Sequence, residues 1–358
     1  MSQPPPEVVV AGHICLDIIP GLSRIAFEPG RLFEAGNAVL STGGAVSNTG
    51  LALHRLGVRV ALVGKVGDDL FGGNVRSLLD RREAGLGESL TVAPGEPTSY
   101  TIVINLSGVD RMFLHAPGCN NTFTADDVPM ELLESCRLMH FGYPPLMARM
   151  FEDEGRELES LLRKAKSAGA TTSLDLSLPD KDAPSDWAPW RAILERCLPW
   201  VDVFLPSYDE LLYMLDLDAY EARKREGLEY EEPPHSLVED ALSLGAKVVG
   251  LKLGDQGMLL RTAKDLGPFG RAAVDSRWLG VSLSTPSFEV DVAGTTGSGD
   301  AAIAGFLMGM MRGFSPEEAV QAAVAVGACC CEAPDATSGV RTWEETEQRI
   351  QGGWKHRA

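Results

Sequence analysis

The chain has 358 residues, and its 50 acidic and 32 basic side chains give a formal net charge of −18. Hydrophobic residues make up 44%, which is ordinary for a globular protein, and the length suffices to bury a large core. Because an acidic surface repels the phosphates of nucleic acids and anionic lipid headgroups, we expect neither a nucleic acid nor a membrane as a partner.

The sequence predicts no membrane-spanning segment, because no apolar run approaches the roughly 18 residues that such a helix needs. Residues 1–7 lack the basic and apolar regions of a secretion signal. The seven cysteines include no Cys-x-x-Cys pair, and the six histidines form no metal-ligand motif. We therefore expect a cytoplasmic protein whose cysteines are buried in a reducing compartment.

The first part of the chain alternates between strands and helices. A β-branched run predicts a buried strand over residues 8–12, and two glycines open a helix that Gly57 ends. A second strand is expected over 58–63 and a second helix over 70–79. This alternation is typical of a parallel sheet with helices on its faces.

Two segments break this alternation. Residues 18–42 are punctuated by Gly and Pro and are expected to be irregular. Two β-rich runs, 98–104 and 111–114, flank a Gly-bearing turn and predict a hairpin. Together these segments, approximately 18–42 and 97–117, indicate a small β-element outside the main sheet.

Alternation resumes in the second part, where no internal repeat and no long linker interrupts it. The chain is therefore expected to form a single α/β domain over residues 1–358. The charged segment 221–234 predicts an exposed helix and loop. The remaining expected elements are strands over 138–141, 171–176, 201–205 and 248–253 and a helix over 152–168.

The most informative stretch is a glycine-rich turn between an expected strand, ending near Val292, and an apolar helix over 301–311. Such a helix would be buried on all sides. Gly297, Ser298 and Gly299 can turn the backbone so that several N–H groups converge at the helix N-terminus, where the helix dipole also favours an anion. The turn therefore predicts an anion site, which an acidic protein needs to bind a phosphate.

Asp300 follows this turn directly, and two interpretations of it stay open. A carboxylate at this place can simply cap the helix N-terminus. It can also serve as a general base that accepts the proton of a hydroxyl as the oxygen attacks phosphorus. The two roles are compatible in geometry and differ in what the loss of the carboxylate does to the rate.

Other phosphate and nucleophile motifs fit this sequence poorly. Gly297-x-Gly299-x-x-Ala302 matches the dinucleotide fingerprint formally, but a helix start at Ser315 stands about where the acidic residue after a second strand belongs. A Walker A loop fails at Gly64-Lys65 for want of the preceding glycine, and a nucleophile elbow fails because Thr296 precedes Ser298.

A second glycine-rich turn, with Gly43 and Gly44, precedes the helix that carries Asn48. Alone it predicts little more than a connection between two elements. Asp17, shortly after the first strand, is by itself an ordinary loop carboxylate. Both nevertheless lie near strand ends, and ligands of open α/β sheets bind there.

Taken together, these stretches resemble the PfkB, or ribokinase-like, family of carbohydrate kinases, from Val8 to about Thr342. Gly43, Gly44 and Asn48 match the family's Gly-Gly-x-x-x-Asn, and residues 295–300 (Thr-Thr-Gly-Ser-Gly-Asp) match its C-terminal signature. Residues 63–72 are similar to a third family segment. The resemblance implies a three-layer α/β/α fold with a mostly parallel central sheet and a small β-sheet lid.

The resemblance also implies an activity, the transfer of the γ-phosphoryl group of ATP to a hydroxyl of a small carbohydrate, with Mg²⁺ as cofactor. Asp300 would be the catalytic base, and the backbone of Gly297, Ser298 and Gly299 would form the anion hole. The sugar hydroxyls would be bound by Asp17, Gly43, Gly44 and Asn48. The nucleotide would be bound by Lys252, Gly254, Gly257 and Ser207, and Glu210 would contact the metal ion through water.

The lid would cover the sugar, and in some relatives it builds a dimer interface, which implies a homodimer here. Two departures from the family pattern bear on the site: Ser207 replaces the usual Asn, and Gly294 replaces an Asp linked to a monovalent-cation site. Dependence on K⁺ therefore stays open. An adenosine-type nucleoside kinase and a non-catalytic sugar or nucleotide binder stay open as alternatives, as do the sugar, the hydroxyl that is phosphorylated, the nucleotide donor and the oligomeric state.

Overall fold

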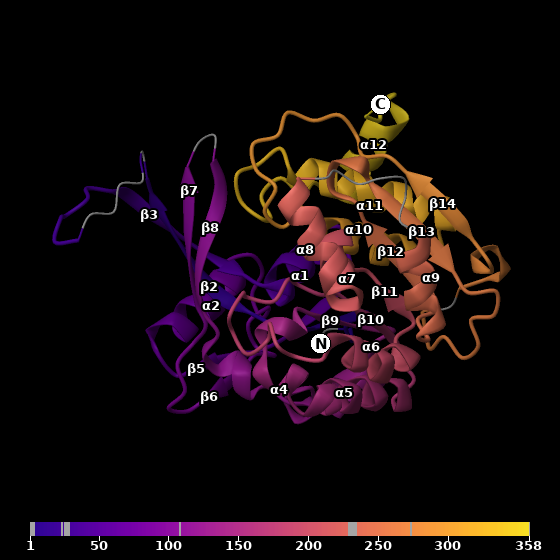
Figure 1. Ribbon diagram of the computed structural model, residues 1–358, viewed down its shortest axis with the longest axis horizontal. Coiled ribbons are helices and arrows are strands. Elements are labelled where there is room, and N and C mark those ends of the chain that lie inside the picture. Colours follow the sequence, from indigo (N-terminus) through magenta and orange to yellow (C-terminus); the bar gives the residue numbers. More distant parts are fainter. Residues whose placement is uncertain are drawn as a thin grey trace.

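The computed structural model describes residues 4–22, 24, 29–106, 109–227, 235–272 and 274–357. Strands and helices alternate through most of this part of the chain (Figure 1). The strands are β1 (Val8–Gly12), β2 (Cys15–Gly21), β3 (Gly36–Gly43), β4 (Val60–Val63), β5 (Lys65–Gly67), β6 (Thr91–Ala93), β7 (Tyr100–Leu106), β8 (Val109–Ala116), β9 (Leu138–Gly142), β10 (Thr171–Leu174), β11 (Val203–Phe204), β12 (Val248–Lys252), β13 (Met258–Thr262) and β14 (Ser282–Thr285). The α-helices are α1 (Ala45–Arg55), α2 (Leu70–Asp80), α3 (Met130–Ser135), α4 (Ala148–Phe151), α5 (Arg156–Ser167), α6 (Trp190–Cys197), α7 (Tyr208–Leu215), α8 (Leu217–Glu226), α9 (His235–Ser243), α10 (Ser298–Met311), α11 (Pro316–Cys330) and α12 (Trp343–Gln351).

The main sheet has eight strands in the order β14-β13-β12-β11-β10-β9-β1-β4. Every neighbouring pair from β12 to β4 is parallel, and only β13 and β14 join antiparallel at one edge. The predicted strands at 8–12, 58–63, 138–141, 171–176, 201–205 and 248–253 all lie in this sheet. The mostly parallel α/β architecture expected from the sequence is thus confirmed.

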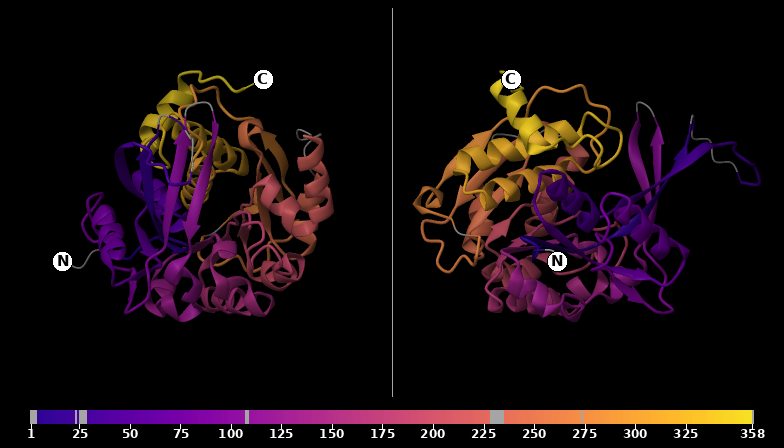
Figure 2. Two further views of the ribbon diagram at one scale, coloured as in Figure 1. Left: turned by 60° about the vertical axis from the view of Figure 1, so that its left-hand side comes forward. Right: turned by 180° about the vertical axis from the view of Figure 1, so that it is seen from behind.

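Helices cover both faces of the sheet, as Figures 1 and 2 show. Along β1, Val8 and Val10 pack into one hydrophobic core with α1, α10 and α11, whereas Val9 and Ala11 pack into a second core with α5, α6, α7 and α9. This alternation follows from the strand geometry, in which successive side chains point to opposite faces. The result is the expected three-layer α/β/α arrangement.

A second sheet, in the order β3-β2-β7-β8, projects from the body beside the main sheet (Figures 1 and 2). The predicted hairpin is confirmed, because β7 and β8 pair antiparallel. The prediction of an irregular segment at 18–42 is wrong at both ends, where residues belong to β2 and β3. These strands are held by pairing with each other and with β7, which is a tertiary effect that local composition does not reveal.

The expected strand that ends near Val292 is not formed. In the segment 287–294, the one bridge joins Phe288 to His356, and the N–H groups of Ala293 and Gly294 donate to the carbonyl of Cys331 (2.8 and 3.2 Å). The loop after α11 therefore supplies the acceptor that a neighbouring strand would otherwise provide.

Three further differences concern element ends. The helix expected from residue 152 begins only at Arg156, because Asp153 and Glu154 have left-handed backbone angles (φ 49° and 56°). The exposed helix in the charged segment is α8, whereas the loop expected at 228–234 lies outside the described residues. Part of the hairpin turn, residues 107–108, also lies outside them.

Two expectations from composition can be compared with the structure. No helix in the described part of the chain is both long and apolar enough to cross a bilayer. The cysteines are free thiols, and all except Cys331 are buried, as expected.

Candidate active site

The glycine turn before α10 has the geometry of an anion site. Gly297 is the N-cap residue in a left-handed conformation (φ 73°), and a Cβ added there would lie 2.6 Å from the Cβ and carbonyl oxygen of Ala336. Only glycine therefore suits this position without strain. The N–H of Ser298 already donates to the Thr295 carbonyl (3.3 Å), which leaves the N–H groups of Gly299 and residue 300 as donors to an incoming anion.

Asp300 lies in the first turn of α10, and its side chain is 3% exposed. Its carboxylate accepts three hydrogen bonds: from Asn48 Nδ2 (3.0 Å), Thr49 Oγ1 (3.2 Å) and the Tyr143 hydroxyl (2.8 Å). The carboxylate therefore bonds to side chains of α1 and of the segment after β9, and it does not cap its own helix. A buried, oriented carboxylate beside an anion site can act as a general base.

The surroundings of Asp300 shift the pKa of its carboxyl group in opposite directions. Burial raises the pKa of its carboxyl above the usual value, while the charge of Lys252 and the three hydrogen bonds oppose that shift. Burial and the neighbouring carboxylate raise the pKa of Tyr143 well above its usual range, so that its hydroxyl remains a donor. Tyr143 has a left-handed backbone (φ 66°), which is uncommon for a residue other than Gly and points to a functional constraint.

Lys252, at the end of β12, forms a buried ion pair with Asp175, which follows β10; their Nζ and Oδ1 atoms are 2.7 Å apart. Burial disfavours the charge of Lys252, but Asp175 and Glu210 outweigh this effect and raise the pKa of its ammonium group. The Lys252 side chain also lies 3.7 Å from the place where a Cβ of Gly299 would be. A fixed positive charge thus stands beside the glycine turn.

A cleft of about 200 Å³ connects the glycine turn with the segment after β12. Lys252, Gly254 and Gly257 line it together with Ser298 and Gly299. The floor is apolar and includes Val324 and Ala328 of α11. The structure thus brings most of the residues expected around a nucleotide into one cavity.

Ser207 and Glu210 lie beside this cleft but do not line it. Ser207 is the N-cap residue of α7, and the two residues form a reciprocal capping box, in which the Glu210 carboxylate accepts from the Ser207 N–H (2.6 Å). Among the described residues, no group of three or more His, Cys, Asp or Glu side chains could hold a metal ion by itself. Glu210 could therefore reach a metal ion only through water or together with other ligands, such as phosphate oxygens.

The residues expected on the sugar side gather around the ends of β2 and β3. A Cβ at Gly43 would lie 2.4 Å from Asp17 Oδ2, and a Cβ at Gly44 (φ 87°) would lie 2.5 Å from His13 Nδ1. The two glycines therefore leave room for two polar side chains. Burial raises the pKa of Asp17 to about 6, although the Cys15 thiol donates to its Oδ1 (3.3 Å).

Several polar residues of this centre carry no motif in the sequence. Thr49, Tyr143 and Asp175 come from three separate segments and meet only in the fold. Asp175 alone had a usable signal, because it lies near the carboxyl end of the strand predicted over 171–176, where ligand-binding residues of parallel sheets often stand. Asn48, expected to bind sugar, donates its Nδ2 to Asp300 and keeps a buried Oδ1 without a partner in the described residues.

Comparisons with known proteins agree on one family. A model described as "pfkB family carbohydrate kinase" matches residues 5–343. A probable fructokinase-4 of Arabidopsis thaliana is 25% identical and covers 96% of this chain and 97% of its own length. A 2-dehydro-3-deoxygluconokinase of Bacillus subtilis is 24% identical, with 89% and 90% covered. Among solved structures, Arabidopsis thaliana ribokinase complexed with ribose and ATP has a TM-score of 0.72 at 21% identity, with 97% of this chain and 99% of that chain covered.

Proposed function

The chain belongs to the pfkB family of carbohydrate kinases, and from this premise we propose that it transfers the γ-phosphoryl group of ATP to a hydroxyl of a small sugar with Asp300 as general base. The observation that carries the proposal is the buried Asp300 carboxylate in the first turn of α10, directly after the glycine turn. This arrangement supports the proposal, because phosphoryl transfer requires a proton acceptor and anion-binding N–H groups close together.

In the proposed mechanism, the N–H groups after Gly297 and the Lys252 ammonium hold the transferring phosphoryl group. Asn48, Thr49 and Tyr143 fix the orientation of the Asp300 carboxylate, which accepts the proton of the attacking hydroxyl. The chemistry of such transfers depends mainly on positioning and electrostatic stabilisation, and base catalysis adds about 10²- to 10⁴-fold.

The nucleotide is proposed to lie in the cleft between Gly254, Gly257 and the N-terminus of α10. The structural relative from Arabidopsis, whose title names bound ATP, supports this donor. Mg²⁺ would neutralise phosphate charge and keep most of its ligands from the nucleotide and water, with Glu210 as a water-mediated contact. Whether K⁺ is also needed is tested by assaying with and without it.

The sugar is proposed to lie between Asp17, Asn48 and the glycines at the end of β3, covered by the second sheet as a lid. A carboxylate that only accepts and an amide that can both donate and accept suit a molecule with several hydroxyls. The relatives named as fructokinase and 2-dehydro-3-deoxygluconokinase support a ketose or sugar-acid acceptor.

The decisive test is the Asp300→Asn variant in a coupled assay of ADP release against a panel of ketoses, aldoses, sugar acids and nucleosides. We expect kcat to fall by about 10²- to 10⁴-fold with little change in KM for ATP. The matched control is Asp240→Asn, which makes the same change at an exposed position on α9. Turnover of the Asp300 variant within about threefold of wild type would contradict the assignment of the base.

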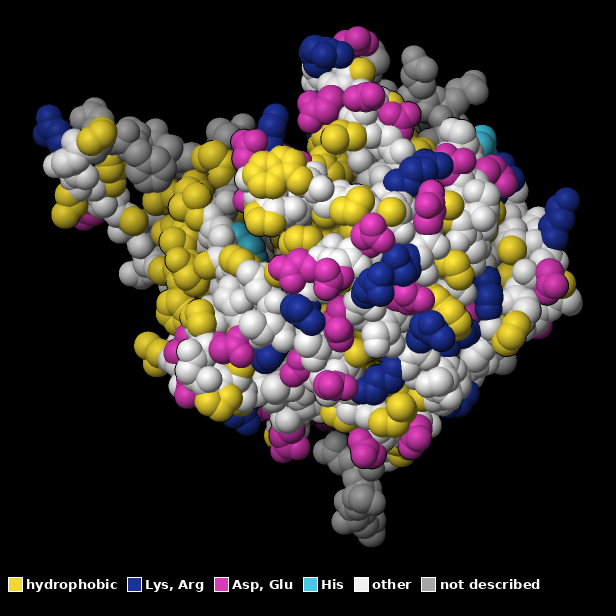
Figure 3. Space-filling view, turned by 60° about the horizontal axis from the view of Figure 1, so that its bottom comes forward, with side chains coloured by type: hydrophobic (Ala, Val, Ile, Leu, Met, Phe, Trp, Pro, Cys, Tyr) yellow, Lys and Arg dark blue, Asp and Glu magenta, His cyan; other side chains and the backbone are white. Residues whose placement is uncertain are grey.

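The lid is also proposed to form the contact of a homodimer. Val39, Leu40, Phe113 and Leu114 on its strands are each more than two-fifths exposed, and Figure 3 shows apolar side chains gathered over this projecting part. Exposed apolar patches of this kind commonly mark interaction surfaces. Sedimentation of wild type and of Leu114→Lys tests this: a monomeric wild type would contradict the proposal.

A further inference from the structure

Four buried polar atoms on the proposed sugar side lack a hydrogen-bond partner in the described residues: Nδ1 and Nε2 of His13, Nε2 of His115 and Oδ1 of Asn48. His13 follows β1 and is 2% exposed, while His115 lies on β8 of the lid. Buried polar groups in native proteins are nearly always paired, and an unpaired one costs about 1–3 kcal/mol. Such a concentration around one site indicates that a ligand completes these bonds.

The two imidazoles face each other across the boundary between the body and the lid. Their ring centroids are 5.0 Å apart, and the His13 ring is 6.1 Å from that of Tyr143, whose hydroxyl contacts Asp300. On the lid side, His115 Nδ1 lies 3.0 Å from Thr101 Oγ1, which fixes the ring and leaves its Nε2 without a partner. The unpartnered atoms thus lie near Tyr143 and the proposed base.

From this geometry we propose that His13 and His115 are specificity-determining residues that each bind one hydroxyl of the acceptor sugar. The inference rests on the proposed function, because it names further contacts of the same sugar site. His13 would bind from the body and His115 from the lid, so that a hydroxyl contact would form on each side of the boundary.

The chemistry of the two rings fits hydroxyl groups. Burial and the proximity of His115 lower the pKa of His13, and burial lowers that of His115, so both rings are neutral at physiological pH. A neutral imidazole has one N–H donor and one acceptor nitrogen, and a hydroxyl can satisfy either. The alternative role of the rings is to fill space beside Tyr143, which would not depend on the hydroxyls of the substrate.

A cycle of variants and deoxy-sugars separates these roles. The acceptor is the best substrate among D-fructose, D-ribose and 2-dehydro-3-deoxygluconate, and KM is measured for it and for its monodeoxy analogues with wild type, His13→Leu and His115→Leu. Loss of the bound hydroxyl should raise KM roughly tenfold in wild type and have little further effect in the variant that lacks its partner. His13→Gln and His115→Gln, which keep an N–H donor, should recover part of the affinity and replace a leucine variant that fails to fold.

Leucine variants that keep the wild-type KM, or that raise it equally for every analogue, would overturn the assignment of the histidines and leave the kinase proposal standing. A wild-type chain that phosphorylates no sugar would refute the proposed function and this assignment with it.

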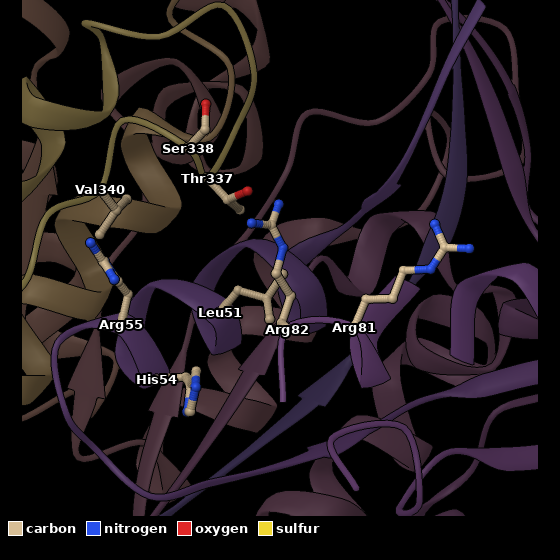
Figure 4. A pocket seen from close by; sticks show the side chains of 8 residues that line it. All are labelled: Leu51, His54, Arg55, Arg81, Arg82, Thr337, Ser338 and Val340. Carbon is tan, nitrogen blue, oxygen red and sulfur yellow. The ribbon is translucent and has the colours of Figure 1, made fainter. Parts of the chain in front are cut away.

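A second and independent feature is a hollow of about 550 Å³ away from the proposed nucleotide cleft (Figure 4). It is bordered by the C-terminal end of α1, the residues after α2 and the segment before α12. Its lining consists of Leu51, His54, Arg55, Arg81, Arg82, Thr337, Ser338 and Val340.

Two arginines of this hollow point toward the same wall. In Figure 4 the guanidinium group of Arg82 lies close to Thr337, and that of Arg55 lies beside Val340 of the same segment. Arg55 forms an exposed ion pair with Glu345 (3.9 Å). Against the effect of burial, hydrogen bonds from Ser338 and Thr337 and the charge of Arg82 lower the pKa of Asp335, although Arg82 forms no ion pair in the described part of the chain. In a chain of net charge −18, a hollow lined by His54, Arg55, Arg81 and Arg82 and by no acidic side chain indicates an anion site.

The same wall contacts the glycine turn of the proposed active site. The Cys330 thiol donates to the carbonyl of Ala336 (3.3 Å), and Ala336 is the residue that packs against Gly297. Asp335 holds the segment in shape, because its Oδ1 accepts from the N–H groups of Thr337 (2.9 Å) and Ser338 (2.8 Å). A ligand that bridges the arginines and this segment would therefore act on the support of the anion hole.

We infer that the hollow binds a phosphorylated small molecule that regulates the kinase. Guanidinium groups match phosphate oxygens in charge and geometry, and the hydroxyls of Thr337 and Ser338 can bond either the phosphate or the hydroxyls of its carrier. The volume lies in the range of small-molecule pockets.

The test is titration calorimetry with inorganic phosphate and with glycerol 3-phosphate, in the presence of a saturating non-hydrolysable ATP analogue that fills the active site. We expect saturable binding to wild type, at least tenfold weaker binding to the Arg55→Gln/Arg82→Gln variant, and a KM for ATP that depends on the bound ligand. The control, Arg149→Gln/Arg163→Gln, removes the same charge from α4 and α5 and should bind as wild type does. Binding of inorganic phosphate alone would assign the site to free phosphate, and tighter binding of the ester would assign it to a phosphorylated metabolite. The inference would be overturned by the absence of saturable binding, or by equal binding to both double variants.

Discussion

Replacement of Asp17 by Asn should stabilise the protein while weakening sugar binding. The carboxylate is confined between β2 and the Gly43 backbone, and burial raises its pKa from 3.8 to about 6. Its ionised form is therefore less favourable in the folded chain than in the unfolded one. Asn keeps an oxygen that can accept from the Cys15 thiol and has no charge to bury.

The size and sign of the effect follow from proton linkage. Below pH 3.8 the carboxyl is protonated in both states and contributes no difference; as pH rises through the interval up to about 6, the folded state loses relative stability, and above that the loss is complete. Since one pKa unit corresponds to 1.36 kcal/mol, the ionised Asp17 lowers the free energy of unfolding by about 3 kcal/mol at pH 7.5.

Urea unfolding of wild type and Asp17→Asn at pH 7.5, 6 and 4.5 measures this. The variant should be more stable by up to about 3 kcal/mol at pH 7.5, and the gain should shrink toward pH 4.5. In the same preparation KM for the sugar should rise at least tenfold. The exposed Asp255→Asn should change stability by less than about 0.5 kcal/mol. A gain that is absent, or that is the same at all three pH values, would refute the reasoning.

Three further variants probe the proposed base and its surroundings. Gly297→Ala should lower kcat, and it should lower the free energy of unfolding by about 1–2 kcal/mol or more. Gly313→Ala, with a similar left-handed φ but open space around it, should lower only the free energy of unfolding. Tyr143→Phe removes a donor to Asp300 and should lower kcat about tenfold and move the acid limb of its pH profile upward, since the lost bond lowered the pKa of the base. Lys252→Met should move that limb further upward and lower kcat at least tenfold, as measured by pH–rate profiles; an unmoved limb in both variants would show that Asp300 is not the titrating base.

The parts of the site that sequence could predict are contiguous in the chain. The turn at residues 297–299 and Asp300 lie next to one another, and their chemistry follows from glycine conformation and helix geometry alone. The alternation of strands and helices could also be predicted, because buried parallel strands are short β-branched runs such as residues 8–12.

What the sequence did not reveal depends on chain segments that meet only in the fold. Tyr143 reaches Asp300 from 157 positions away, in a left-handed conformation that nothing in its neighbours requires. His13 and His115 looked like isolated histidines because no ligand motif joins them. A small β-element over segments 18–42 and 97–117 was expected, but its strands at 15–21 and 36–43 were not located, because their pairing with each other and with the hairpin is a long-range effect and their local composition favours turns.

The negative charge of the protein explains why the glycine turn is the feature of the site that the sequence predicts best. The carboxyl groups of Asp175, Glu210 and Asp300 all act on the ammonium of Lys252, and burial raises the pKa of Asp175 and Asp300, so the proposed reaction centre is crowded with acidic groups before any nucleotide enters. An ATP molecule adds further negative charge, and the surface of a −18 protein offers no compensation. In the proposed function the attraction comes from the Lys252 ammonium, from a divalent cation that arrives with the phosphates, and from backbone N–H groups at the start of α10. Only glycines let these N–H groups converge at the start of a buried helix, so the anion site can be predicted from the local sequence. The carboxylates and histidines around it can come from any strand end that the fold brings near, so they cannot be predicted in this way.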